Sequence, residues 1–134
     1  GVVDGTENPP SNLYTQKMHE VQKHVSVTNH GYLGYAVITN KKFWDGLPAD
    51  VRGQLEQAMK EATKYANDIA KDDNDKALEE VRKSGKSQVH VPTAAEKLAL
   101  KKAMIKVHTE MAGRIGKENI DAIYKVTNFD PSKL

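Results

Sequence analysis

The feature that most constrains the fold is a long amphipathic pattern between Pro48 and Ser84. Apolar residues recur in it at three- and four-residue spacing, the period of an α-helix with one apolar face. Pro48 suits the first helical position, and Gly85 favours a stop. A helix over 48–84 would be ~55 Å long at a rise of 1.5 Å per residue. Because a single domain of 134 residues is smaller than that, the helix should contact more than one body.

Shorter patterns flank this helix. Pro9 and Pro10 predict the start of a helix running to about Val21, because proline is tolerated in the first turn. Thr93–Glu96 forms a capping box, the signature of a second start, for a helix that runs to Ile115. Further patterns predict strands and short helices: strands His24–Thr28, Gly31–Thr39 and Gln88–Val91, a helical turn at Phe43–Trp44 ended by Gly46, and a last helix after Gly116. The predicted fold class is therefore α/β, helix-rich.

Composition excludes several classes of function. Lys and Arg (20) nearly balance Asp and Glu (18), and the basic residues are scattered, so no nucleic-acid partner is expected. The absence of cysteine excludes disulfides and thiolate metal sites. No apolar run approaches the ~20 residues that span a bilayer. The charge run from Asp68 to Glu80 is interpreted as a solvated helix face.

Candidate site residues lie in the loops of the first third of the chain. Asn8 offers amide donors and an acceptor, and it follows the apolar pair Val2–Val3, interpreted as the end of a strand, and precedes a predicted helix. It is equally a candidate ligand contact or a helix cap. Glu7 with His30 is either a general acid–base pair or a structural salt bridge, and the latter is favoured because no nucleophile motif accompanies it. Tyr32 could face a ligand. No metal site is expected from the histidine spacing.

Four motifs in order resemble one family. Val3–Pro9, Lys17–His24, Thr28–Tyr35 and Asn40–Pro48 are similar to the DctP-type solute-binding proteins of tripartite ATP-independent periplasmic (TRAP) transporters. The Gly-Tyr-Leu-Gly-Tyr sequence within the third motif resembles the dicarboxylate branch. The resemblance covers nearly the whole chain and weakens only towards the C-terminus.

The resemblance implies the C-terminal portion of a two-lobed periplasmic-binding-protein fold. Residues 1–127 would supply parts of both lobes, the helix at about 48–84 would span them, and 128–134 would be a tail. The family implies a periplasmic protein that captures an organic acid, here expected to be a dicarboxylate, and delivers it to the subunits of a membrane permease. It implies no catalysis, and neither a cofactor nor a metal is expected.

The resemblance also assigns roles to residues. Asn8 matches the family's ligand-contacting asparagine, and Tyr32 is expected to line the ligand site. Glu7 and His30 match a structural polar pair near the hinge. The arginine that clamps the ligand carboxylate in the family lies before the segment that starts here, and none of the arginines at 52, 82 and 114 is expected to replace it. Without that arginine and the first lobe, this chain alone is not expected to bind its ligand tightly.

The missing lobe would cover faces of the long helix and of the strand at Gly31–Thr39. Because these faces are left exposed in this chain, self-association is expected. The chain is expected to form a homodimer or higher oligomer, with domain swapping of the long helix or of a strand as one route. Two other functions stay open. One is an independent helical protein-interaction module that uses Pro48–Ser84 and Thr93–Ile115. The other is a small hydrolase that uses Glu7 and His30.

Overall fold

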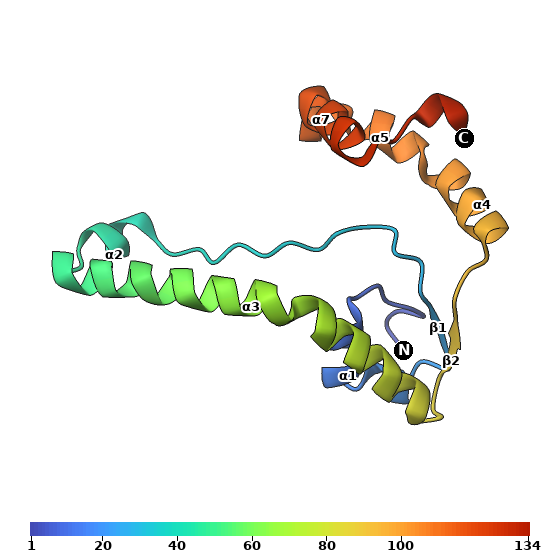
Figure 1. Ribbon diagram of the computed structural model, residues 1–134, viewed down its shortest axis with the longest axis horizontal. Coiled ribbons are helices and arrows are strands. Elements are labelled where there is room, and N and C mark those ends of the chain that lie inside the picture. The colour runs from blue at the N-terminus through green and yellow to red at the C-terminus, as the bar shows by residue number, and fades with distance from the viewer. The chain divides into compact units, whose positions relative to one another are not determined.

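The computed structural model describes residues 1–134 as two compact units. Unit 1 comprises Gly1–Val25 and Asn29–His90, and unit 2 comprises Ser26–Thr28 and Val91–Leu134. Figure 1 labels most of the elements, which in chain order are α1 (Pro10–Thr15), η1 (Met18–Glu20), β1 (His24–Ser26), α2 (Lys41–Asp45), α3 (Ala49–Lys83), β2 (Gln88–His90), α4 (Ala94–Met104), α5 (Lys106–Glu110), α6 (Ala112–Ile115), α7 (Lys117–Thr127) and η2 (Pro131–Lys133).

The long helix is present as predicted. α3 is one uninterrupted helix of 35 residues, preceded by Pro48 and followed by Ser84. Asp50 lies in its first turn and Arg82 and Lys83 in its last, so the charges complement the helix dipole. No helix of the protein combines the length and the apolar character needed to cross a membrane.

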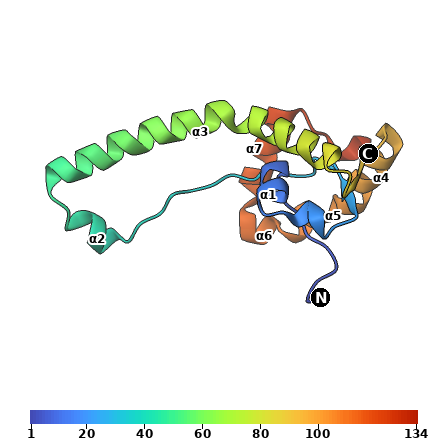
Figure 2. The same ribbon diagram turned by 90° about the horizontal axis from the view of Figure 1, so that it is seen from below.

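The core of unit 1 lies between α1 and the C-terminal part of α3, which run beside each other in both views (Figures 1 and 2). Leu13 of α1 and Ala77 and Val81 of α3 are buried there, Val81 completely. His19 is also buried, and its ring stacks on Tyr14 at a centroid distance of 5.2 Å. The remaining turns of α3 bury little surface, so unit 1 is stabilised mainly at one end of its longest helix.

The first helix is shorter than predicted. α1 ends at Thr15, and Lys17 adopts a left-handed conformation with φ of 55°. The chain then forms the 3₁₀ turn η1 instead of continuing to Val21. A left-handed residue cannot continue a right-handed helix, and the break allows His19 to be buried beside α1.

Two of the three predicted strands are present in shorter form. β1 and β2 make a two-stranded sheet, and the backbone N–H of Gln88 donates to the carbonyl of Lys23 at 2.8 Å. Neither Val2 nor Val3 belongs to a strand, and both are exposed, so the predicted strand end there is wrong.

The prediction of a strand at Gly31–Thr39 is also wrong for this chain. The segment is extended but has no hydrogen-bonded ladder, and it appears in Figure 1 as the thin trace leading to α2. Its apolar side chains are exposed, for example Val37 at 79% and Ile38 at 87%. A strand needs a neighbour to pair its backbone groups, and this chain supplies none to the segment. The helical turn that follows is α2, capped by Asn40, whose Oδ1 accepts from the Phe43 N–H at 3.1 Å.

Unit 2 consists of short helices. The predicted capping box is confirmed: Thr93 Oγ1 accepts from the Glu96 N–H, and the Glu96 carboxylate accepts from the Thr93 N–H at 2.7 Å. The helix that it starts divides into α4, α5 and α6 rather than running unbroken to Ile115. Gly116, with φ of 93°, separates α6 from α7 as predicted.

An aromatic cluster joins α5, α7 and the C-terminal segment. His108 Nδ1 lies 2.7 Å from the Tyr124 hydroxyl, and Phe129 packs against both rings. The Phe129 N–H donates to the Tyr124 carbonyl at 3.0 Å, while Asn128 is left-handed with φ of 51°. The start of the 128–134 segment is therefore held against α7.

Candidate ligand-binding loop

Asn8 lies in the loop before α1, and its side chain is half-buried. Its Nδ2 donates to Thr6 Oγ1 at 3.0 Å and to Met18 Sδ at 3.6 Å. The first contact lies within the loop, whereas the second joins the loop to η1. These two contacts hold the amide against η1.

Asn8 does not cap the helix that follows it. The N-cap of α1 is Pro9, and no side chain of the loop accepts a hydrogen bond from the first turn. The helix-cap interpretation of Asn8 is therefore wrong, because a cap must accept from the second or third helical N–H. Helix capping is therefore excluded as the role of Asn8, and its Nδ2 instead contacts Thr6 and Met18.

The cap of α1 comes from α3 instead. The Ser11 backbone N–H donates to Asn74 Oδ1 at 3.0 Å, and Asn74 Nδ2 donates to the Ala70 carbonyl of its own helix at 2.8 Å. Asn74 therefore satisfies one of the orphan N–H groups of α1 from 63 residues away in the chain. Sequence reasoning missed it, because it lies inside the charge run that was interpreted as a solvated face.

The other three candidate site residues are exposed to solvent. Tyr32 is 97% exposed, and Glu7 and His30 are exposed as well. The segment that carries Tyr32 is tethered to α1 by a neighbour, since Asn12 Nδ2 donates to the Tyr35 hydroxyl at 3.3 Å. That tether lies in the same unit as the Asn8 loop.

A surface ion pair supports η1, the turn that carries Met18. Lys86 Nζ lies 2.8 Å from Glu20 Oε1, and this hydrogen bond, with the positive charge of Lys86, lowers the pKa of Glu20 below its ordinary value. Ser87 next to it is buried, and its hydroxyl lies 2.8 Å from the His19 carbonyl and 2.7 Å from that of Gln22. Both contacts connect the turn to the segment between α3 and β2.

Neither a metal-binding cluster nor an arginine lies in the loop before α1. No group of three His, Cys, Asp or Glu side chains is placed to hold a metal ion. The arginines lie on helices, Arg52 and Arg82 on α3 and Arg114 on α6, and Arg82 pairs with Glu79 of its own helix. A shallow apolar hollow lies elsewhere, and all of its lining residues belong to Asn40–Leu47 around α2.

Known proteins share both the sequence and the fold. The model of the DctP family, described as "Bacterial extracellular solute-binding protein, family 7", matches residues 1–114. The C4-dicarboxylate-binding periplasmic protein DctP of Rhodobacter capsulatus is 61% identical over 127 residues, 95% of this chain and 38% of that protein. The C4-dicarboxylate-binding protein DctB of Bacillus subtilis is 36% identical over 89% of this chain and 34% of its own length. This chain thus spans little more than a third of these relatives.

Solved structures give the same assignment. A TRAP periplasmic solute-binding protein from Shewanella oneidensis, with bound succinate, superposes with a TM-score of 0.85 at 36% identity, over 90% of this chain and 40% of that one. Another from Pseudomonas aeruginosa, with bound L-malate, has a TM-score of 0.72 at 41% identity, over 78% of this chain and 36% of that one. This helix-rich α/β chain belongs to the DctP family of bacterial extracellular solute-binding proteins.

Proposed function

We propose that this chain is the C-terminal part of the periplasmic solute-binding component of a TRAP transporter, and that the whole protein captures a C4-dicarboxylate. The observation that carries the proposal is the 61% identity, over 95% of this chain, to a protein named as C4-dicarboxylate-binding. The succinate and L-malate held by the similar structures support the same ligand class. The role is binding rather than catalysis, and it uses no cofactor.

Asn8 hydrogen-bonds the ligand, and the side chain of Tyr32 lines the ligand site. Two observations support Asn8: the side chain is not used as a helix cap, and Met18 and Thr6 hold its amide. The exposure of Tyr32 supports its availability to a ligand. Glu7 and His30 form the polar pair that orients the hinge. The family resemblance implies that the main carboxylate-binding arginine belongs to the remainder of the protein.

The mechanism is capture by closure of two lobes. Residues 1–127 contribute to both lobes, and α3 runs between them. Ligand contacts on both lobes stabilise the closed state relative to the open one. The size of this stabilisation equals the difference between the free energies with which the ligand binds the two states. The loaded protein then docks on the membrane permease and delivers the acid to it.

Alone, this chain forms a homodimer or a higher oligomer. Tyr32, Val37 and Ile38 are each at least 79% exposed, apart from any paired strand, and Tyr65 of α3 is 67% exposed. In the whole protein the rest of the chain covers these side chains. In its absence a second copy covers them, by simple association or by exchange of the extended segment or of α3.

Calorimetric titration with succinate and with L-malate tests the ligand assignment. The whole encoded protein should bind at least one of them saturably, and this chain alone should bind much more weakly. Asn8→Ala in the whole protein should weaken binding about fivefold, the value of one neutral hydrogen bond. Asn119→Ala, a change in α7, is the matched control and should leave the Kd unchanged.

Three results would argue against the proposal. Absence of binding by the whole protein rejects the ligand class. A Kd that Asn8→Ala leaves unchanged rejects the role of Asn8. Equal affinity of this chain and the whole protein rejects the assignment of the main contacts to the remaining chain. Gel filtration tests the self-association, which a monodisperse monomer at micromolar concentration would contradict.

A further inference from the structure

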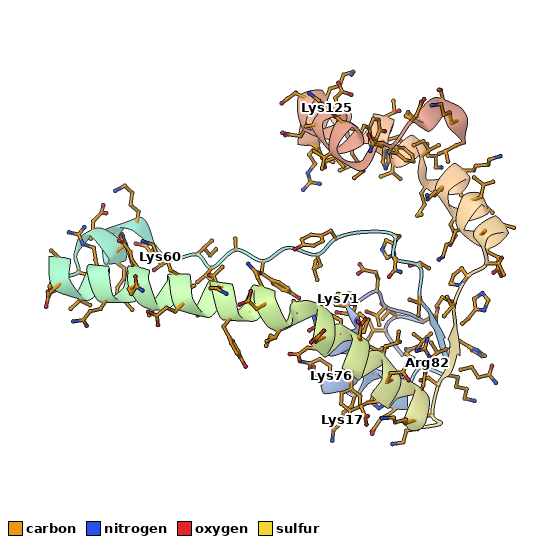
Figure 3. All side chains as sticks on the ribbon, in the orientation of Figure 1. Lys17, Lys60, Lys71, Lys76, Arg82 and Lys125 are labelled. Atoms are coloured by element: carbon orange, nitrogen blue, oxygen red, sulfur yellow. The ribbon has the colours of Figure 1, made fainter.

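We propose that Asn74 is a positioning residue for the ligand contact of Asn8, acting from the C-terminal half of α3 through the start of α1. The inference rests on the proposed function, because it assigns a second residue to the same site. It begins with the hydrogen bond from the Ser11 N–H to Asn74 Oδ1, which is 3.0 Å long and half-buried. Figure 3 labels Lys71 and Lys76, between which Asn74 lies on α3.

The link from Ser11 back to Asn8 is short and stiff. Only Pro9 and Pro10 separate the two residues, and each proline ring locks its own φ angle near −65°. The residue before each proline is restricted to extended conformations as well, which applies here to Asn8 itself. A displacement of the Ser11 amide is therefore passed to Asn8 instead of being absorbed by the loop.

The residue before α1 does not cap its first turn. Its N-cap is a proline without a side-chain hydrogen bond, and the helix has only six residues. Leu13 anchors it by burial further along. Asn74 is the side chain that accepts from the first turn, so it sets where the helix begins and where the loop before it ends.

Met18 holds Asn8 from the other side. Its Sδ accepts from Asn8 Nδ2 at 3.6 Å, and η1, which carries Met18, is anchored by the buried His19. The amide of Asn8 is thus held by η1, while its backbone is held by α3 through Ser11. Loss of the α3 contact releases the backbone, and the amide then samples orientations that do not meet a ligand.

A double-mutant cycle in the whole protein tests this coupling with succinate and L-malate as probes. Asn74→Ala should raise the Kd by up to about fivefold, because it can lose no more than the ligand hydrogen bond of Asn8 itself. Asn74→Asp should restore part of the loss, because a carboxylate oxygen accepts from the same N–H although its partner oxygen faces the Ala70 carbonyl. Asn74→Ala added to Asn8→Ala should cause no further loss, since the effect acts through Asn8.

Asn119→Ala is the matched control. Asn119 Nδ2 donates to the carbonyl four residues earlier, as Asn74 Nδ2 does, but this bond joins α7 to the end of α6 in unit 2, outside the unit that holds Asn8. It should leave the Kd unchanged. Unchanged affinity in Asn74→Ala, or the same weakening in the Asn8→Ala background, would overturn the inference.

Hydrogen exchange of the free protein separates this inference from the proposed function. Asn74→Ala should speed amide exchange in residues 6–13 relative to the wild type, with no ligand present. If the wild type binds neither acid, the proposed ligand is wrong while this measurement still decides the coupling. If exchange in residues 6–13 is unaffected, Asn74 does not position the loop.

Discussion

Asn74 caps a helix to which it does not belong: its Oδ1 accepts from the Ser11 N–H at 3.0 Å, across 63 residues of chain. The contact joins α3 to α1 at the edge of the core formed by Leu13, Ala77 and Val81. Asn74→Ala in this chain should lower the free energy of unfolding by about 1 kcal/mol, the usual value of a lost cap. Urea denaturation followed by circular dichroism measures it, and a midpoint equal to the wild type's would contradict a structural contribution.

Val81 is the one completely buried large side chain of the protein. Val81→Ala should lower the free energy of unfolding by about 2 kcal/mol, because two methyl groups leave a core that has few other members. The matched control is Val126→Ala, since Val126 is 82% exposed and loses little burial. The same urea series tests both variants, and equal effects would show that the core lies elsewhere.

The hydrogen bond between His108 and Tyr124 supports unit 2. Tyr124→Phe removes the hydroxyl 2.7 Å from His108 Nδ1 but keeps the ring that packs on Phe129, so the loss should be about 1 kcal/mol. Tyr65→Phe at a 67% exposed position is the control. Hydrogen exchange in α5 and α7 locates the effect, and faster exchange confined to unit 1 would be inconsistent with it.

The ion pair of Glu20 and Lys86 makes the stability of η1 depend on pH. Lys86 lowers the pKa of Glu20 in the folded state, so the stabilisation is present above the unfolded pKa and is lost as the pH falls through the folded pKa. Glu20→Gln should therefore lower the urea midpoint slightly at neutral pH and leave it unchanged at about pH 2, where both forms are neutral. Both partners are exposed, which keeps the effect small.

Glu56→Gln, at an exposed position on α3, is the control for the charge change itself. The change in the urea midpoint between neutral pH and about pH 2 should be the same in Glu56→Gln as in the wild type. A loss in Glu20→Gln that is equally large at about pH 2 and at neutral pH would show that packing, not charge, is responsible.

The elements that the sequence determined are those with local causes. Pro48, the three- and four-residue spacing and the stop near Gly85 were enough to predict α3, since helix hydrogen bonds form within one segment. The capping box of Thr93 and Glu96 and the break at Gly116 were predictable for the same reason. The ordered motifs also identified the family, whose model matches residues 1–114.

Tertiary structure decided what depends on a distant partner. Gly31–Thr39 has the composition of a strand but remains unpaired, because a ladder needs a neighbour that no local pattern can supply. His19 is buried, although its side chain carries no signal that distinguishes it from a surface histidine. Asn74 could be recognised as the cap of α1 only once packing brought α3 beside Ser11, since the hydrogen bond joins residues 63 apart.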